Sequence, residues 1–107
     1  MPLKLENVGE VVATRTLVLA RDGDAAVAVT VLLGKPQAEG GDYYCPYQIK
    51  GAGDEKVRCA YGVDAFQALQ LALSILGVEL EVLNKELGGR LRWECGDKND
   101  FGFPSLD

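Results

Sequence analysis

The side chains that could do chemistry in this chain are mainly acids and cysteines, because its 107 residues include no histidine. This excludes Ser-His and Cys-His catalytic pairs, histidine-ligated zinc or haem, and histidine-based pH switches. Cys45, Cys59 and Cys95 are an odd number without a C-x-x-C spacing, which fits neither a disulfide framework nor a zinc site. We therefore expect free thiols, as in a reducing cytoplasm.

The acidic residues at predicted turns are the only candidates for metal or acid-base chemistry. Asp42, Asp54 and Glu55 supply the oxygen ligands that Ca²⁺ and Mg²⁺ prefer, but their spacing is not that of an EF-hand loop. Turn formation explains these residues better than ligation does. We expect no metal and no other cofactor, and keep a small carboxylate- or metal-dependent enzyme using these three residues as an alternative.

An aromatic cluster is the most unusual composition in the chain. Tyrosines that pack a ring while keeping the hydroxyl in water are typical of recognition surfaces, so the candidate ligand or partner surface is taken from this cluster. It consists of Tyr43, Tyr44, Tyr47, Gln48 and Tyr61. Strand alternation favours a core position for Tyr43 and Tyr47 and leaves Tyr44 and Gln48 facing out. A second alternative is an apolar ligand pocket between helix and sheet, with Leu69 added to Tyr43, Tyr47 and Tyr61.

The charge balance narrows the classes of partner. The chain has 16 acidic and 11 basic residues and a formal charge of -5, which argues against nucleic-acid and anionic-membrane binding. The first ten residues lack the apolar core of a signal peptide, and no stretch is expected to reach the roughly 18 apolar residues of a membrane span. We expect a soluble cytoplasmic protein.

The elements that must position these residues begin with a hairpin. Residues 10–22 and 25–33 are rich in β-branched residues and alternate in polarity, which predicts two strands. A three-residue loop at 21–23 would place Leu17 opposite Val27. The same register puts Arg15 opposite Val29, so we expect a bulge or a sheet edge there.

A second hairpin is predicted for residues 42–50 and 57–61, after a loop at 35–41. A register with Ile49 opposite Cys59 and Tyr47 opposite Tyr61 would place every apolar odd-numbered residue of both strands on one face. Pro46 cannot donate to a sheet ladder, so this strand should lie at an edge or be interrupted at the proline.

From residue 65 the apolar period changes to that of a helix, which Asp64 and Gln67 should cap and which should end before Gly88. A continuous stripe should cover the sheet. It consists of Phe66, Leu69, Leu73, Leu76, Leu80, Leu83 and Leu87. The first half is apolar all round and should be nearly fully buried, so a second covering surface is needed, for which a homodimer is a reasonable source.

These elements predict an α+β fold, with an antiparallel sheet of four to five strands in two hairpins packed against one long helix. A short C-terminal strand is expected at 90–94, followed by an irregular tail that Phe101 and Phe103 pin to the domain. The whole chain, 1–107, should be a single domain with irregular ends at 1–9 and 95–107.

Four short motifs resemble a family of small uncharacterised bacterial proteins classed as a domain of unknown function. They are Cys-Pro-Tyr-Gln-Ile at 45–49, Gly-Val-Asp-Ala-Phe-Gln-Ala-Leu at 62–69, Leu-Arg-Trp at 91–93 and Gly-Phe-Pro at 102–104. The resemblance covers the chain from about Asp42 onward and carries no catalytic or binding residue. Because the chain lacks histidine-based acid-base machinery and is acidic overall, the expected function is a non-enzymatic binding or regulatory module that acts through contact with a protein partner or a second copy of itself.

Overall fold

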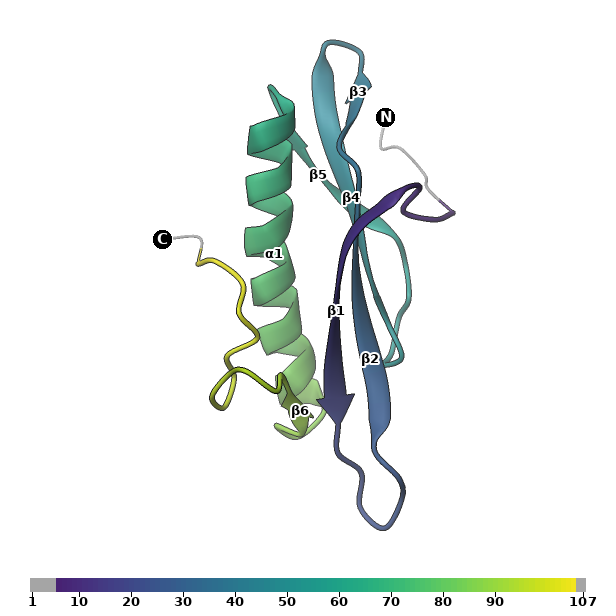
Figure 1. Ribbon diagram of the computed structural model, residues 1–107, viewed down its shortest axis with the longest axis vertical. Coiled ribbons are helices and arrows are strands. Elements are labelled where there is room, and N and C mark those ends of the chain that lie inside the picture. Colours follow the sequence, from purple (N-terminus) through teal and green to yellow (C-terminus); the bar gives the residue numbers. More distant parts are fainter. Residues whose placement is uncertain (1–5, 106–107) are drawn as a thin grey trace.

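The computed structural model describes residues 6–105 and shows an α+β fold, as predicted, with one long helix beside an antiparallel sheet (Figure 1). The elements in chain order are β1 (Val11–Leu19), β2 (Val27–Gly34), β3 (Gln37–Glu39), β4 (Asp42–Lys50), β5 (Arg58–Gly62), α1 (Ala65–Glu86) and β6 (Leu91–Arg92). The predicted irregular ends, 1–9 and 95–107, fall partly outside the described residues, and residues 93–105 form no helix or strand.

Strand β4 organises the sheet. The strand order is β3-β4-β2-β1-β6, and β5 pairs with β4 in addition. Along β4, residues 42–44 pair with β3, residues 47–50 pair with β2, and residues 43–47 pair with β5. The strand that carries most of the aromatic cluster is therefore the interior strand from which the rest of the sheet extends.

The first predicted hairpin is present, but its loop is longer than expected. Leu17 lies opposite Val29 and Leu19 opposite Val27, so the loop is residues 20–26 and not 21–23. Two contacts favour the longer loop: the Ala20 amide donates to the Arg90 carbonyl, and the Arg90 guanidinium pairs with Asp22 at 2.6 Å. The shift is two residues, which keeps the buried face unchanged because strand side chains alternate with a period of two.

The predicted register of the second hairpin is also wrong, and here the error changes which residues of β5 are buried. Tyr47 lies opposite Arg58, not Tyr61, and Tyr44 lies opposite Tyr61. A shift of three residues turns β5 over relative to the prediction, so Tyr61 is on the outer face and Ala60 is buried beside Cys45. The small side chain of Ala60 allows α1 to pack closely over β5.

Pro46 is not at a sheet edge, and it pairs with Cys59 in an unbroken register with β5; only on the other side of β4 is the ladder interrupted at the proline. It falls between the part of β4 that pairs with β3 and the part that pairs with β2. The region 35–41, expected to be a loop, contains β3 and a tight turn. Gly40 and Gly41 both have positive φ (55° and 90°), the backbone that a two-residue hairpin turn requires.

The helix begins and ends where the sequence predicts. The Asp64 side chain accepts from the Gln67 amide at 2.8 Å, and the Gln67 side chain accepts from the Val63 amide at 2.7 Å. At the other end, the amides of Gly88 and Gly89 donate back to the carbonyls of Lys85 and Asn84. This paired pattern satisfies carbonyls that would otherwise lack a partner at the end of a helix.

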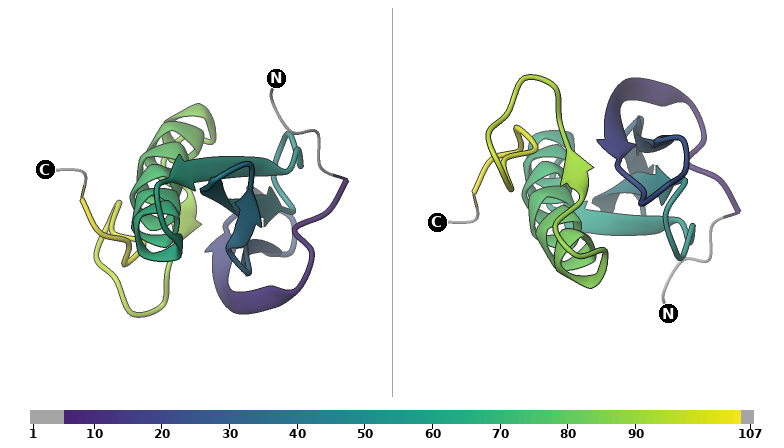
Figure 2. Two further views of the ribbon diagram at one scale, coloured as in Figure 1. Left: turned by 90° about the horizontal axis from the view of Figure 1, so that it is seen from above. Right: turned by 90° about the horizontal axis from the view of Figure 1, so that it is seen from below.

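The predicted apolar stripe is only partly correct. The helix packs on β4 and β5 (Figure 2), and its buried positions in the first half are Ala68, Ala72, Ser74 and Leu76, while Phe66 is 76% exposed. The prediction that this half is buried on nearly all sides is wrong. β5 approaches so closely that alanines face the sheet, which rotates Phe66 away from it.

The C-terminal segment covers the side of the helix nearest β1. Arg15 points inward from β1, its guanidinium lying 4.0 Å from the centre of the Trp93 ring and 4.9 Å from that of Phe103. Arg15 also donates to the Phe101 carbonyl at 2.9 Å, and Phe101 is buried. We call Arg15 with these aromatic contacts the arginine clamp. The bulge considered at Arg15 is absent, because Arg15 pairs regularly with Val31 and the register shift in β1 lies between Val11 and Ala13. The alternative of a sheet edge is correct, since β6 pairs only with Val18 and Leu19 on the other side of β1.

Helix α1 differs from expectation in one further respect. By length and composition alone it is apolar enough to cross a membrane, although the sequence was not expected to contain such a stretch. Core helices of soluble proteins can meet the same criterion, and α1 packs along the sheet, ending in a polar half with Glu79, Glu81 and Glu86. The fold is consistent with a soluble protein.

Candidate functional site

Apart from the more exposed Phe66, the apolar residues on the outer side of the helix form a row of four. Leu71, Ile75, Val78 and Val82 are spaced 4, 3 and 4, so they lie within about 60° of one another around the helix axis. Val78 is 41% and Val82 54% exposed, while Leu71 and Ile75 are partly buried against the core. We call this row the apolar ridge. Only 22% of the most apolar 18-residue stretch of α1 is buried, so much of the helix has no cover within the described chain.

One side of the apolar ridge borders a groove between α1 and the loop that joins β4 to β5. This loop–helix groove has a volume of about 340 Å³. Apolar residues, among them Ile49, Val78, Val82 and Leu83, line it together with charged residues. Lys56 and Glu86 are among the charged residues that border it. A groove of this size with an apolar lining and charged borders fits a side chain or a short segment of a partner protein.

A chain of polar contacts fixes one wall of the loop–helix groove. The Tyr47 hydroxyl donates to Glu79 Oε2 at 2.6 Å, and Arg58 Nε lies 3.4 Å from Glu79 Oε1. The Arg58 guanidinium also lies 3.6 Å from Asp54. Burial and the hydrogen bond to Glu79 raise the pKa of the Tyr47 phenol well above its usual range. Tyr47 therefore stays protonated as a donor, and the network holds β4, the loop and α1 together.

A second groove lies on the other side of the apolar ridge, between α1 and the C-terminal segment. This tail–helix groove has a volume of about 430 Å³ and is bordered by Ser74, Gly77 and Glu81 of the helix and by Phe103 and Pro104. Val78 lines both grooves. The apolar ridge is thus raised between two depressions, the shape that helix packing uses when a ridge of one helix enters a groove of another.

The structure separates the aromatic residues predicted as a partner surface. Tyr47 is only 4% exposed and belongs to the core, and Tyr43 also packs against the core. Gln48 faces outward, yet it is only 9% exposed because it donates to the Glu55 carbonyl of the overlying loop. Tyr44 and Tyr61 form a ring pair on the outer face, with centroids 6.5 Å apart. Only this pair keeps the surface position of a candidate partner site.

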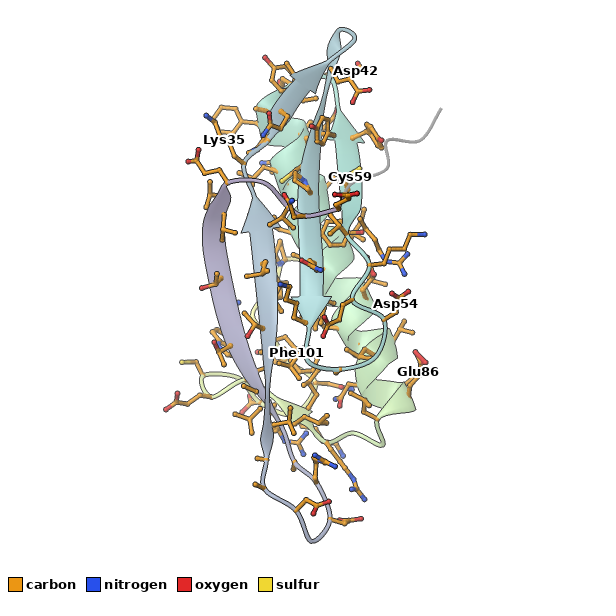
Figure 3. The ribbon with its side chains drawn as sticks, turned by 90° about the vertical axis from the view of Figure 1, so that its right-hand side faces the viewer. Lys35, Asp42, Asp54, Cys59, Glu86 and Phe101 are labelled. Carbon is orange, nitrogen blue, oxygen red and sulfur yellow. The ribbon has the colours of Figure 1, made fainter. Side chains whose placement is uncertain are left out.

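The structure also separates the acidic residues of the enzyme alternative. Asp42 lies at one end of β4 and Asp54 in the loop at the other end (Figure 3). Asp54 accepts from the Lys56 amide and Glu55 from the Gly51 amide, so both carboxylates support the turn. No cluster of three metal-ligating side chains occurs in residues 6–105. The apolar-pocket alternative meets a similar obstacle, because Tyr61 lies on the opposite face from Tyr43 and Tyr47.

The cysteines are free thiols in three different settings. Cys45 is buried, Cys59 is partly buried and Cys95 is exposed. Cys45 and Cys59 are closer than predicted, because Cys59 lies opposite Pro46, but they face opposite sides of the sheet. Burial, with a smaller contribution from Cys59, raises the pKa of the Cys45 thiol to about 11. A thiol held in its neutral form is a poor nucleophile, so Cys45 is structural.

The surface residues that sequence reasoning missed are Val78, Val82 and the pair Arg58 and Glu79. A signal for the valines was present, since the apolar ridge follows the same 4, 3, 4 spacing as the predicted stripe. Two such rows on one helix cannot be ranked from spacing alone. The contact between Arg58 and Glu79 depends on the register of β5, which the sequence pattern predicted wrongly.

Comparison with known proteins relates this chain to one family. No curated protein and no solved structure gives a match. A family model described as "Domain of unknown function (DUF6968)" matches residues 13–105. The match begins well before Asp42, where the sequence resemblance was expected to start, and it includes both Arg15 and the segment that Arg15 holds. The chain therefore belongs to this family of domains of unknown function.

Proposed function

We propose that this protein is a non-enzymatic binding or regulatory module of the cytoplasm that acts through protein–protein contact at the apolar ridge. The observation that carries this proposal is the exposure of Val78 and Val82 between two grooves. Exposed apolar residues that adjoin one another and are rimmed by polar residues are typical of protein interaction sites. A partner helix or loop would bury both valines and fill the grooves beside them.

The chemistry of the loop–helix groove supports binding over catalysis. Its carboxylate at Glu79 is occupied by Tyr47 and Arg58, and its carboxylate at Asp54 is occupied by Arg58 and the loop backbone. These groups are committed to holding the wall of the groove. Lys56 and Glu86, which border the same groove, can instead orient a polar partner segment.

Affinity capture from the native cell tests this proposal. We compare the wild-type chain with Val82→Glu, which places a charge in the apolar ridge, and with Val12→Glu as a matched control. Val12 is 49% exposed on β1, similar to Val82, but lies away from the ridge. We expect a partner that binds the wild type and the control and is lost with Val82→Glu. A partner retained equally by all three proteins would contradict the proposed site.

The outer-face pair Tyr44 and Tyr61 is a second candidate surface for the same function. Its support is the exposure of Tyr61, at 46%, beside the Tyr44 ring. Tyr44→Ala removes one ring without touching the core or the apolar ridge. If the partner binds through the outer face, this variant loses the partner and Val82→Glu keeps it, so the two surfaces are distinguished within one experiment.

A further inference from the structure

We propose that the open edge of β1 binds an extended segment of a different protein as an added strand, with one apolar side chain of that segment entering a pocket between the sheet and α1. This peptide-binding site is separate from the apolar ridge and goes beyond the proposed function. Two independent features support it: backbone groups without a partner strand, and an apolar pocket beside them. Together with the charge of the domain, they identify the kind of occupant.

The side of β1 that faces away from β2 is open along the middle of the strand. β1, drawn in purple, forms one border of the sheet (Figure 3), where β6 pairs only with its last two residues. The Ala20 amide donates to the Arg90 carbonyl on this side. Because the backbone groups of successive strand residues point to alternate sides, those of Thr14 and Thr16 also point away from β2. No strand within residues 6–105 pairs with them there.

The usual devices that block a sheet edge do not protect this stretch. Exposed edges are commonly shielded by lysines, prolines, bulges or very short strands. β1 is nine residues long and contains neither lysine nor proline, and its register shift lies between Val11 and Ala13, before the open stretch. Its only charged residue, Arg15, is held inward by Trp93 and Phe103. The edge therefore offers unpaired donors and acceptors to a second strand.

An apolar pocket opens beside the same edge. It has a volume of about 120 Å³ and lies between β1 and β2 on one side and α1 and the C-terminal segment on the other. Its lining includes Ala13, Leu33, Leu73 and Phe103. Among the described residues that line it, only Arg15 is charged, and its guanidinium is already engaged in the arginine clamp. Every second side chain of a strand added to β1 would point to this face of the sheet, so the pocket accepts one apolar side chain of that strand.

Backbone pairing selects an extended segment as the occupant. The amides and carbonyls along a helix are bonded within the helix, so a helix cannot bond to the open edge, whereas a strand presents free groups at matching spacing. Peptide-binding domains that add a strand to a sheet in this way combine backbone hydrogen bonds, which give affinity, with side-chain pockets, which give specificity. The pocket adds the requirement for an apolar side chain at one position of the bound strand.

Register and charge favour a different protein over a second copy of this chain. Pairing β1 with itself about a two-fold axis at Thr14 or Arg15 places the Arg15 side chain of one copy opposite Ala13 or Arg15 of the other, beside a pocket that suits an apolar group. An axis further along β1 in either direction meets the register shift or β6. Two copies would also carry the same formal charge of -5. Basic residues complement that charge, so the occupant is an extended segment with an apolar anchor flanked by lysine or arginine.

Selection from a peptide library tests this site. Random nine-residue peptides displayed on phage are selected on the wild-type chain, and the affinities of the selected peptides are measured by fluorescence anisotropy. We expect peptides with one apolar residue flanked by basic residues, whose affinity falls at least tenfold with Thr14→Pro and stays unchanged with Thr14→Ala. Proline removes the edge amide, and alanine keeps it. A wild-type chain that selects no such peptide overturns the proposal, as does equal binding to all three proteins.

An N-methyl scan of a selected peptide uses only the wild-type chain, so it does not depend on the folding of a variant. N-methylation removes one backbone donor, and we expect it to abolish binding at alternate peptide positions and to be tolerated at the positions between them. Tolerance at every position excludes strand pairing and overturns the proposal.

Two further measurements separate this site from other modes of binding. Peptide affinity that falls with Val82→Glu and not with Thr14→Pro would assign the peptide to the apolar ridge. In sedimentation velocity we expect the same mass for the wild-type chain and Thr14→Pro, whereas a wild-type dimer that Thr14→Pro dissociates would identify a second copy as the occupant. Either of these contrary results overturns the proposal.

Discussion

At the scale of single residues, the polar side chains of this protein serve to hold elements together. Tyr47, Arg58 and Glu79 come from β4, β5 and α1, and their contacts join the three elements at one wall of the loop–helix groove. Among the described residues, no buried side-chain nitrogen or oxygen lacks a hydrogen-bond partner. A fully satisfied set of this kind stabilises one arrangement of the fold, since losing one partner leaves the other unpaired.

Replacing Tyr47 by phenylalanine should measure the contribution of this network to stability. The change removes the hydroxyl that donates to Glu79 and keeps the ring in the core. Hydrogen bonds to charged groups contribute about 1.5–3 kcal/mol, and the remaining contact of Glu79 with Arg58 places the expected loss of unfolding free energy near the lower end. Urea denaturation measures the loss. Tyr44→Phe, on the outer face, is the control, and equal stability of the two variants would contradict the structural role of the network.

The buried thiol of Cys45 predicts a stability change at alkaline pH. Its pKa is raised from 9.0 to about 11 in the folded state, so above pH 9 the unfolded chain loses this proton more readily than the folded chain. The stabilisation that the protonated Cys45 thiol contributes to the fold is present below pH 9 and is lost as the pH rises through 11. The raised pKa of Tyr47 acts in the same direction. We expect the free energy of unfolding to fall over this range, with a shallower fall in Cys45→Ala. Identical slopes would refute the assignment to Cys45.

At the scale of elements, the arginine clamp joins the two ends of the family domain. Arg15 lies on β1, near the start of the matched region, and Trp93, Phe101 and Phe103 lie near its end. The helix backbone lies closest to β4 and β5, and the segment 93–105 reaches β1 through the contacts of Arg15. An irregular segment without sheet or helix hydrogen bonds depends on such side-chain contacts to stay in place.

Arg15→Ala should release this segment. The variant loses two cation–π contacts and a charged hydrogen bond to a backbone carbonyl, so we expect a loss of about 2 kcal/mol in unfolding free energy. Trp93 is the only tryptophan, and its fluorescence should shift to longer wavelength as the ring gains contact with water. Hydrogen exchange should rise in residues 96–104. Arg21→Ala, which removes an exposed ion pair with Asp24, is the control; a similar response from both variants would argue against the clamp.

Gly102 allows the same segment to pass directly over Trp93. Its φ is +79°, and an added Cβ would fall 2.2 Å from an atom of the indole ring. Gly102→Ala should therefore cost several times more stability than Gly23→Ala, which has a similar φ of +71° but open space around it. Backbone strain alone costs about 1–2 kcal/mol in this region, so the difference between the two melting temperatures isolates the steric contact. Equal melting temperatures would show that the tail can move away from Trp93.

At the scale of the whole molecule, the fold is long and thin, and much of its helix is left uncovered. A single helix cannot cover an elongated sheet and also bury its own far side. The C-terminal segment 93–105 covers part of the helix, through the buried Phe101 and through the hydrogen bond from Asn84 to Asn99 at 2.8 Å. Val78 and Val82 of the apolar ridge stay exposed beside both the sheet and the tail.

A chain shortened to residues 1–94 should test how far the domain depends on its tail. Removing the rest uncovers the side of α1 facing β1 and leaves Asn84 without one of its partners. We expect the loss of a cooperative thermal transition, or a melting temperature lowered by more than 10 °C, because a loss of 1 kcal/mol shifts the transition of a domain of this size by about 4–8 °C. An unchanged transition would show that the tail is dispensable for folding.

Much of the fold was predictable because it depends on local signals. The helix limits follow from a capping carboxylate and a glycine pair, and the strands follow from alternating β-branched residues. The registers were harder to predict. Shifting one strand against its partner by an even number of residues keeps the same face buried, as in the first hairpin. The second hairpin differs from its predicted register by an odd number, so Ala60 takes the core position expected for Tyr61. Alternation could not reveal that α1 needs the smaller residue.

The sequence by itself determined the element types, the caps of the helix, the α+β class and the absence of histidine chemistry, because each depends on residue identity or on neighbours a few positions apart. Only the tertiary structure decided which of two apolar rows on α1 faces the sheet, how Arg15 is accommodated, and that Tyr47 contacts Glu79. These outcomes depend on the close approach of β5 to the helix and on the path of the tail. Both are set by packing between segments distant in sequence, where volume and shape matter and periodicity gives no information.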